Sequence, residues 1–163
     1  MSIAGLHTSI LTAVGALVIC LSAFAATPEP QSQQAKEIKA MVDRAATLID
    51  KKGKDAFPEF KKQGGEWYKG DTYLFVADMN GITLVNVAFP DENGKNRLDL
   101  KDADGKPFVR EIIAMLKKQD SGWIDYAWPK PGETKPSKKS AYVKKAKLGK
   151  ETVYVGAGIY IDK

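Results

Sequence analysis

Apolar residues recur at helical spacing where the charged part of the chain begins. One stripe contains Ile38, Met41, Val42, Ala45, Leu48 and Ile49. This spacing predicts an amphipathic helix that starts near Ala35 and that Gly53 can end. A second, shorter helix is expected from about Lys54 to Lys62, because the pair Gly64-Gly65 follows it and would stop it.

The pattern then changes to the period of two that is typical of strands. The stretch Asp71 to Asp78 predicts a strand, and Asn80-Gly81 predicts a tight hairpin turn. The returning strand would run from Ile82 to Val87. A polar, turn-rich stretch follows and reaches Pro107, which is tolerated in the first turn of a helix.

The remaining third of the chain predicts one helix and three strands. The buried stripe of the helix would consist of Phe108, Ile112, Met115 and Leu116. The strands are expected from Trp123 to Trp128, from Lys139 to Lys145 and from Glu151 to Ile161. Helices at the start, a hairpin and a final antiparallel meander together predict an α+β fold.

Strand alternation sorts the side chains into two faces. Leu74 and Val76 share one face of the first strand. Val153, Val155 and Ile159 likewise share one face of the last strand. The other face would carry the aromatic residues Tyr73, Phe75, Tyr126, Trp128, Tyr154 and Tyr160. The aliphatic face suits packing on the long helix. The aromatic face is either the wall of a small-molecule pocket or ordinary core beneath the polar loop and its helix.

The amino-terminal part differs from the rest in charge. The first 28 residues contain no Asp, Glu, Lys or Arg, and Ile10 to Phe24 is almost wholly apolar. This is typical of a signal peptide, with Ala23 and Ala25 favouring cleavage before Ala26, although an uncleaved membrane anchor is the alternative. We therefore expect a signal peptide at residues 1–25, a flexible leader at 26–34 and one domain at 35–163.

Composition excludes several kinds of chemistry for the mature chain. Its single cysteine, Cys20, and single histidine, His7, both lie in the predicted signal peptide. A disulfide, a cysteine nucleophile, an imidazole base and a histidine-bound zinc are then excluded, so we expect neither an enzyme nor a cofactor. The net charge of +5 is small for an exported domain and argues against nucleic acid as a partner.

The order of motifs resembles the single Cache domain, the extracytoplasmic sensor module of bacterial chemoreceptors and histidine kinases. The matching stretches are "GDTYLFVADMNG", "NGKNRLDLKDADGKPFVREI", "GWIDYAWPKPG", "KKSAYVKK" and "VGAGIYID". The resemblance implies a PAS-like fold, with a five-stranded antiparallel sheet behind a long amino-terminal helix. It also implies a periplasmic or secreted location and binding of a short carboxylic acid.

The resemblance also points to ligand-binding residues. Lys139 matches a lysine of the family, and Tyr126, Trp128 and Tyr142 stand where the family has similar residues. Arg97 and Tyr73 could add a cation and a hydroxyl donor. The family's hairpin commonly ends in His-Pro, whereas this chain has Phe89-Pro90. Because no residue follows Lys163, we expect a stand-alone form that acts alone or through a membrane receptor or histidine kinase.

Three alternatives remain open at this point. Lys139 and Tyr142 are an odd number of residues apart and would point to opposite faces unless Lys139 precedes the regular strand or a bulge resets the alternation. Lys139 could also belong to a solvated lysine-rich surface. The segment from Leu100 to Glu111 resembles a calcium loop but lacks the first carboxylate. Finally, the scaffold could have lost its ligand and serve as a protein interaction module for an envelope receptor.

Overall fold

The computed structural model describes residues 30 and 32–161. The predicted signal peptide, the first four positions of the predicted leader and residue 31 lie outside this part of the chain. Within the described part, no helix combines the length and the apolar character that crossing a bilayer requires.

The first element is the long helix α1, Gln33–Lys52. It begins two residues before the predicted start, because the Ser32 side chain accepts a hydrogen bond from the Ala35 amide and so caps the helix. Gly53 follows as the C-cap with a positive φ of 59°, as the sequence suggested. The predicted second helix is shorter than expected and is divided into a 3-10 turn, Gly53–Ala56, and α2, Phe57–Phe60.

The main sheet has five antiparallel strands in the order β4-β3-β7-β6-β5. The strands are β3 (Phe75–Asp78), β4 (Thr83–Asn86), β5 (Ser121–Pro129), β6 (Pro136–Leu148) and β7 (Glu151–Tyr160). Between β4 and β5 the chain forms a 3-10 turn, Pro90–Glu92, and helix α3, Phe108–Lys118. The expected α+β class, five-stranded sheet and long amino-terminal helix are thus confirmed.

The predicted strand Asp71 to Asp78 is in fact two strands. β2 (Thr72–Tyr73) pairs with β1 (Tyr68–Lys69) in a separate two-stranded sheet, and β3 starts after a break at Leu74. At this break the Leu74 amide donates to the Trp67 carbonyl, while its own carbonyl accepts from the Val87 amide. The chain therefore changes partners at Leu74, which alternation within one segment cannot reveal.

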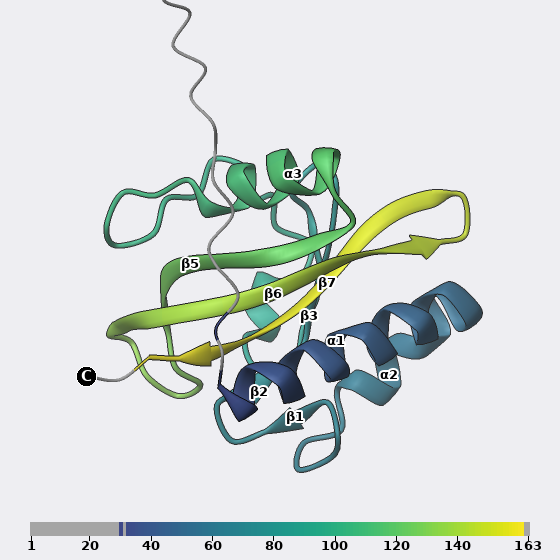
Figure 1. The fold of residues 1–163 in the computed structure, drawn as a ribbon, viewed down its shortest axis with the longest axis horizontal. Coiled ribbons are helices and arrows are strands. Elements are labelled where there is room, and N and C mark those ends of the chain that lie inside the picture. The colour runs from purple at the N-terminus through teal and green to yellow at the C-terminus, as the bar shows by residue number, and fades with distance from the viewer. Residues whose placement is uncertain (1–29, 31, 162–163) are drawn as a thin grey trace, which may run out of the picture.

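The two faces of the main sheet are covered by different helices. α1 packs on β6 and β7, whereas α3 packs on β5 and β6 from the opposite side (Figure 1). The α1 layer buries the aliphatic face, including Leu74, Val76, Val153 and Val155. The α3 layer buries Tyr126, Tyr154 and the stripe of α3. The aromatic face thus lies under α3 and the loop that precedes it, as predicted.

Candidate ligand-binding site

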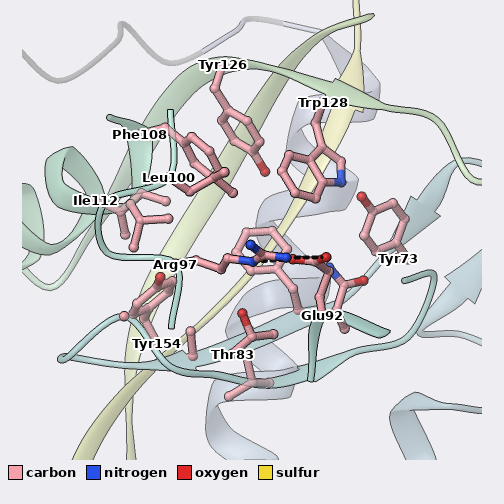
Figure 2. A pocket seen from close by; sticks show the side chains of 16 residues that line it. Tyr73, Thr83, Glu92, Arg97, Leu100, Phe108, Ile112, Tyr126, Trp128 and Tyr154 are labelled. Carbon is pink, nitrogen blue, oxygen red and sulfur yellow. Dashed lines mark hydrogen bonds and ion pairs between the residues drawn. The ribbon is translucent and has the colours of Figure 1, made fainter. Parts of the chain in front are cut away.

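A pocket opens between the aromatic face of the sheet and the segment that runs from β4 to α3. Its non-atom space is about 530 Å³, including the part that is continuous with solvent, and about 50 Å³ of this can hold the centre of a water-sized molecule. Its walls come from β2, β3, β4, β5, β7, α3 and the loop between β4 and α3. Figure 2 shows the side chains that line it, among them Tyr73, Thr83, Glu92, Arg97, Leu100, Phe108, Ile112, Tyr126, Trp128 and Tyr154. Both interpretations of the aromatic face therefore apply, since these residues line a pocket and belong to a core.

Ring contacts fix the aromatic walls. Tyr126 stacks on Phe108 of α3, with ring centroids 4.4 Å apart and planes 5° from parallel. Trp128 meets Phe108 and Phe89 edge-on, at 5.8 and 5.9 Å. Phe89 also contacts the Tyr73 ring at 5.7 Å, so the residue in place of the family's histidine extends the aromatic cluster. Such edge-on and stacked contacts hold large side chains in defined positions.

A chain of hydroxyl groups connects the pocket wall to the ends of two strands. The Tyr160 hydroxyl donates to the Pro129 carbonyl at 2.5 Å. Because its only proton is then used, the Tyr73 hydroxyl is the donor in the 3.3 Å contact between the two tyrosines. Burial raises the pKa of Tyr73 well above its usual value and that of Tyr160 to about 12, so both stay protonated near neutral pH.

Lys139 lies on the pocket side of β6, behind this aromatic wall. It pairs with Tyr126 on one neighbouring strand and with Tyr160 on the other. Its Nζ atom is 4.0 Å from the Tyr73 ring centroid, and 5.1 and 5.7 Å from the centroids of Tyr160 and Phe75. The amino group thus sits among three aromatic rings, two of which, Tyr73 and Phe75, also line the pocket.

A glycine makes room for the Lys139 side chain. A Cβ atom added at Gly158 of β7 would lie 2.7 Å from Lys139 Cε and 2.7 Å from the Ser140 carbonyl oxygen. The aliphatic part of the Lys139 side chain therefore passes over the Gly158 backbone toward the Tyr73 ring. A side chain at position 158 would block this path, which explains why the motif VGAGIY has glycine there.

The environment of Lys139 disfavours its charge. The residue is 1% exposed, and no acidic side chain in residues 30 and 32–161 forms an ion pair with it. Burial lowers the pKa of Lys139 to about 7. The interpretation of Lys139 as part of a solvated basic surface is therefore wrong, whereas its neighbour Lys138 is exposed. The aromatic rings offer a cation only partial compensation for lost water.

Arg97 lines the pocket but is already paired. Its Nε and Nη2 atoms donate to the two carboxylate oxygens of Glu92 at 2.5 and 2.6 Å. The dashed lines in Figure 2 show the pair, with Arg97 extending among the lining side chains toward Glu92. Both side chains are largely shielded, at 27% and 17% exposure. This bidentate arrangement is among the strongest that charged side chains form.

Tyr142 was expected among the ligand-binding residues with Tyr126 and Trp128, but it lies on the other face of the sheet. It packs with Trp123 in the layer under α1, with ring centroids 5.4 Å apart, and Lys39 of α1 lies 5.0 Å from its ring. β6 pairs in unbroken register with β5 and β7 from Lys139 to Tyr142. Without a bulge, residues three apart must point to opposite faces, and Lys139 is the one on the pocket side.

The segment that resembles a calcium loop is held by its own backbone. Asp102 Oδ1 accepts from the Asp104 and Lys106 amides, and Asp102 Oδ2 accepts from the Ala127 amide of β5. Glu111 pairs with Lys106 at 3.3 Å. Asp102 therefore ties the loop before α3 to the edge of the sheet, which accounts for the pattern of carboxylates there.

Sequence reasoning placed four of its six candidates at one pocket. Tyr73, Arg97, Tyr126 and Trp128 line it, Lys139 lies behind its wall, and Tyr142 is elsewhere. Glu92 and Phe108 were missed as lining residues. Phe108 could have been found, because it opens the helix that was expected to cover the aromatic face. Glu92 gave no comparable signal, since it lies in an irregular loop.

Comparison with known families agrees with this geometry. The family described as Single Cache domain 2 matches residues 30–163. The methyl-accepting chemotaxis protein McpP of Pseudomonas putida is 30% identical over 96 residues, and the sensor histidine kinase MctS of Rhizobium johnstonii is 36% identical over 95. Each match covers 58% of this chain but only 17% and 20% of those proteins, respectively.

Solved structures have the same fold. A methyl-accepting chemotaxis protein from Vibrio parahaemolyticus is 29% identical, with a TM-score of 0.64, covering 79% of this chain and 89% of the other. A Cache chemosensory domain, described in terms of carboxylic acid recognition, has a TM-score of 0.67 at 24% identity, covering 79% of this chain and 94% of the other. The fold predicted from the motif order is therefore shown independently by family and by structure.

Proposed function

Because the chain belongs to the single Cache domain 2 family, we propose that it reversibly binds a short organic acid in the pocket beneath α3. Cache domains are sensory ligand-binding modules of chemoreceptors and histidine kinases, not catalytic ones. They act outside the cytoplasm, which fits the signal peptide expected at residues 1–25 and a periplasmic or secreted location. The ligand and the downstream partner belong to the proposal.

One observation carries the proposal, namely the buried lysine without a counter-charge. Lys139 is 1% exposed, and its pKa is lowered to about 7 because burial disfavours the ammonium form. A ligand carboxylate beside Nζ would supply the missing negative charge and restore the ammonium form. Burying a lysine without a counter-charge destabilises the fold, so its position here favours a role in binding.

The pocket wall can supply the remaining contacts. Within the described residues, the Tyr126 hydroxyl and the Trp128 indole nitrogen make no hydrogen bond. Both side chains line the pocket, and Figure 2 shows them on the same side of it as Tyr73. These two donors can bind carboxylate or hydroxyl oxygens, while Phe108 and Leu100 offer apolar surface to a short carbon chain.

The relatives support the same ligand class. The related Cache domain of known structure is described for carboxylic acid recognition, and the curated relatives are a chemotaxis receptor and a sensor kinase. By analogy, the binding signal of this chain would pass to a membrane receptor or histidine kinase. The alternative is an interaction module without a ligand, and an absence of binding to every acid in the titration below would favour it.

Isothermal titration calorimetry with acetate, propionate, butyrate and lactate tests the proposal. We expect saturable binding of at least one acid, and we expect Lys139→Met to weaken it by about tenfold or more, since a charge-assisted contact is lost. Lys138→Met is the matched control, because Lys138 is adjacent in β6 but exposed. It should leave the affinity unchanged. Equal losses in both variants, or no binding of any acid, would contradict the proposal.

A further inference from the structure

Among the described residues that line the pocket, two carry a formal charge, and these two neutralise each other. They are Glu92 and Arg97, joined through both carboxylate oxygens at 2.5 and 2.6 Å. Lys95 also lies 3.6 Å from Glu92 Oε1, but its side chain is 50% exposed and does not line the pocket. Its charge is therefore largely screened by water. The lining as a whole presents no net charge to a ligand.

The pair occupies the Nε–Nη2 edge of Arg97 and neutralises its charge. A guanidinium usually binds a carboxylate through two parallel hydrogen bonds, and here Glu92 receives both from Nε and Nη2. A ligand carboxylate that approached Arg97 from this side would have to displace Glu92 and leave it unpaired at 17% exposure. An ion pair shielded in this way is costly to break, because one charge is left without compensation.

We infer that Glu92 determines specificity by occupying Arg97, so that the pocket accepts acids with one carboxylate and rejects those with two. This inference rests on the proposed function, in which Lys139 supplies the cation for the first carboxylate. Among the described lining residues, a second carboxylate on the same ligand would meet no cation that is not already neutralised, and Glu92 would repel it. Specificity of this kind comes from the unfavourable contact that the wrong ligand makes.

Butyrate and succinate form a matched pair of probes, because they have the same number of carbon atoms but one and two carboxylates. Calorimetry on the native protein is expected to show butyrate binding about tenfold or more tighter than succinate. In Glu92→Gln the guanidinium becomes available, and the affinity for succinate should rise by about tenfold or more. The affinity for butyrate should change by less than about threefold.

Two further variants separate charge from shape. The double variant with Glu92→Gln and Arg97→Gln lacks the freed cation, so the gain for succinate should disappear. Glu92→Asp keeps the negative charge and should keep succinate weak. Circular dichroism confirms that each variant is folded, and the ratio of the two affinities in the native protein tests the inference without any variant.

The outcomes distinguish the inference from the proposed function. Butyrate binding with an unchanged succinate affinity in Glu92→Gln would overturn the role of Glu92 and leave carboxylate binding intact. Equal affinities for both acids in the native protein would overturn it as well. If neither acid binds to the native protein or to Glu92→Gln, the inference fails, whereas the proposed function fails only if acetate, propionate and lactate do not bind either.

Discussion

At the scale of single residues, Lys139 combines features that rarely coexist in a folded protein. It is almost fully buried, it is surrounded by ring faces, and within the described chain no carboxylate balances it. Buried charges ordinarily have a partner or lose their charge, and the lowered pKa of Lys139 indicates the second outcome at alkaline pH. The residue is thus poorly suited to stability and well suited to binding an anion.

This conflict predicts that the unliganded protein gains stability when the lysine is removed. The pKa of Lys139 is about 7 in the folded protein, against an ordinary lysine value of 10.5 that applies to the unfolded chain. Between about pH 7 and pH 10.5 the unfolded chain therefore binds a proton at this lysine that the folded protein does not. The free energy of unfolding therefore falls as the pH is lowered from 10.5 to about 7 and stays low below 7. Lys139→Met should raise it by roughly 1 to 4 kcal/mol at pH 6 and by less at pH 9.

Urea unfolding at the two pH values, without added acid, measures this difference. Lys138→Met is again the control, because an exposed lysine should change the stability by less than about 0.5 kcal/mol at either pH. A destabilised Lys139→Met at pH 6 would show that the rings stabilise the ammonium group more than burial disfavours it.

Alternation along a strand sufficed to place Lys139 and Tyr142 on opposite faces, but not to say which face each took. That choice depends on the pairing of Lys139 with Tyr160 and Tyr126, which are far away in the sequence. The reach of Lys139 toward Tyr73 further depends on Gly158, whose importance appears only when β6 and β7 lie side by side. Local patterns cannot report contacts of this kind.

At the scale of elements, the pocket depends on an irregular segment being held in place. The loop that leads to α3 carries the ion pair and Leu100, and Asp102 ties it to β5 through the Ala127 amide. Sequence reasoning identified the turn and the helix start at Pro107 but weighed Asp102 only as a metal ligand. Its tie to the sheet edge is a long-range hydrogen bond that no spacing rule encodes.

Asp102→Ala is expected to lower the free energy of unfolding by about 1–3 kcal/mol, because three backbone amides lose their acceptor. Asp104→Ala is the matched control two residues away, since Asp104 is exposed, and it should have little effect. Thermal unfolding with calcium and with EDTA should give the same result for the native protein. A calcium-dependent stability would instead restore the metal interpretation.

At the scale of the whole molecule, the main sheet packs against a different layer on each of its two faces. Its aliphatic face is closed by α1, and its aromatic face is left partly open under α3 (Figure 1). The periodicity of the helices and strands was sufficient to predict this division. The sequence could not predict the partners of Arg97 or the break at Leu74, because both depend on how distant segments meet.

The position of the Tyr73 ring against Lys139 has a consequence for the rate at which a ligand can bind. Nζ lies 4.0 Å from the ring centroid, so we expect a carboxylate that enters from the pocket side to reach the amino group after the ring moves. Association would then include a unimolecular step that precedes contact. Stopped-flow tryptophan fluorescence should show observed rates that level off as the acid concentration rises.

Tyr73→Phe keeps the ring and should keep this plateau, although it loses the hydroxyl that donates to Tyr160. Tyr73→Ala removes the ring and should give rates that increase linearly with concentration. Rates that are linear in the native protein would mean that the amino group is reached without ring movement. With the plateau present, the speed of response to a change in acid concentration would be set by one aromatic side chain.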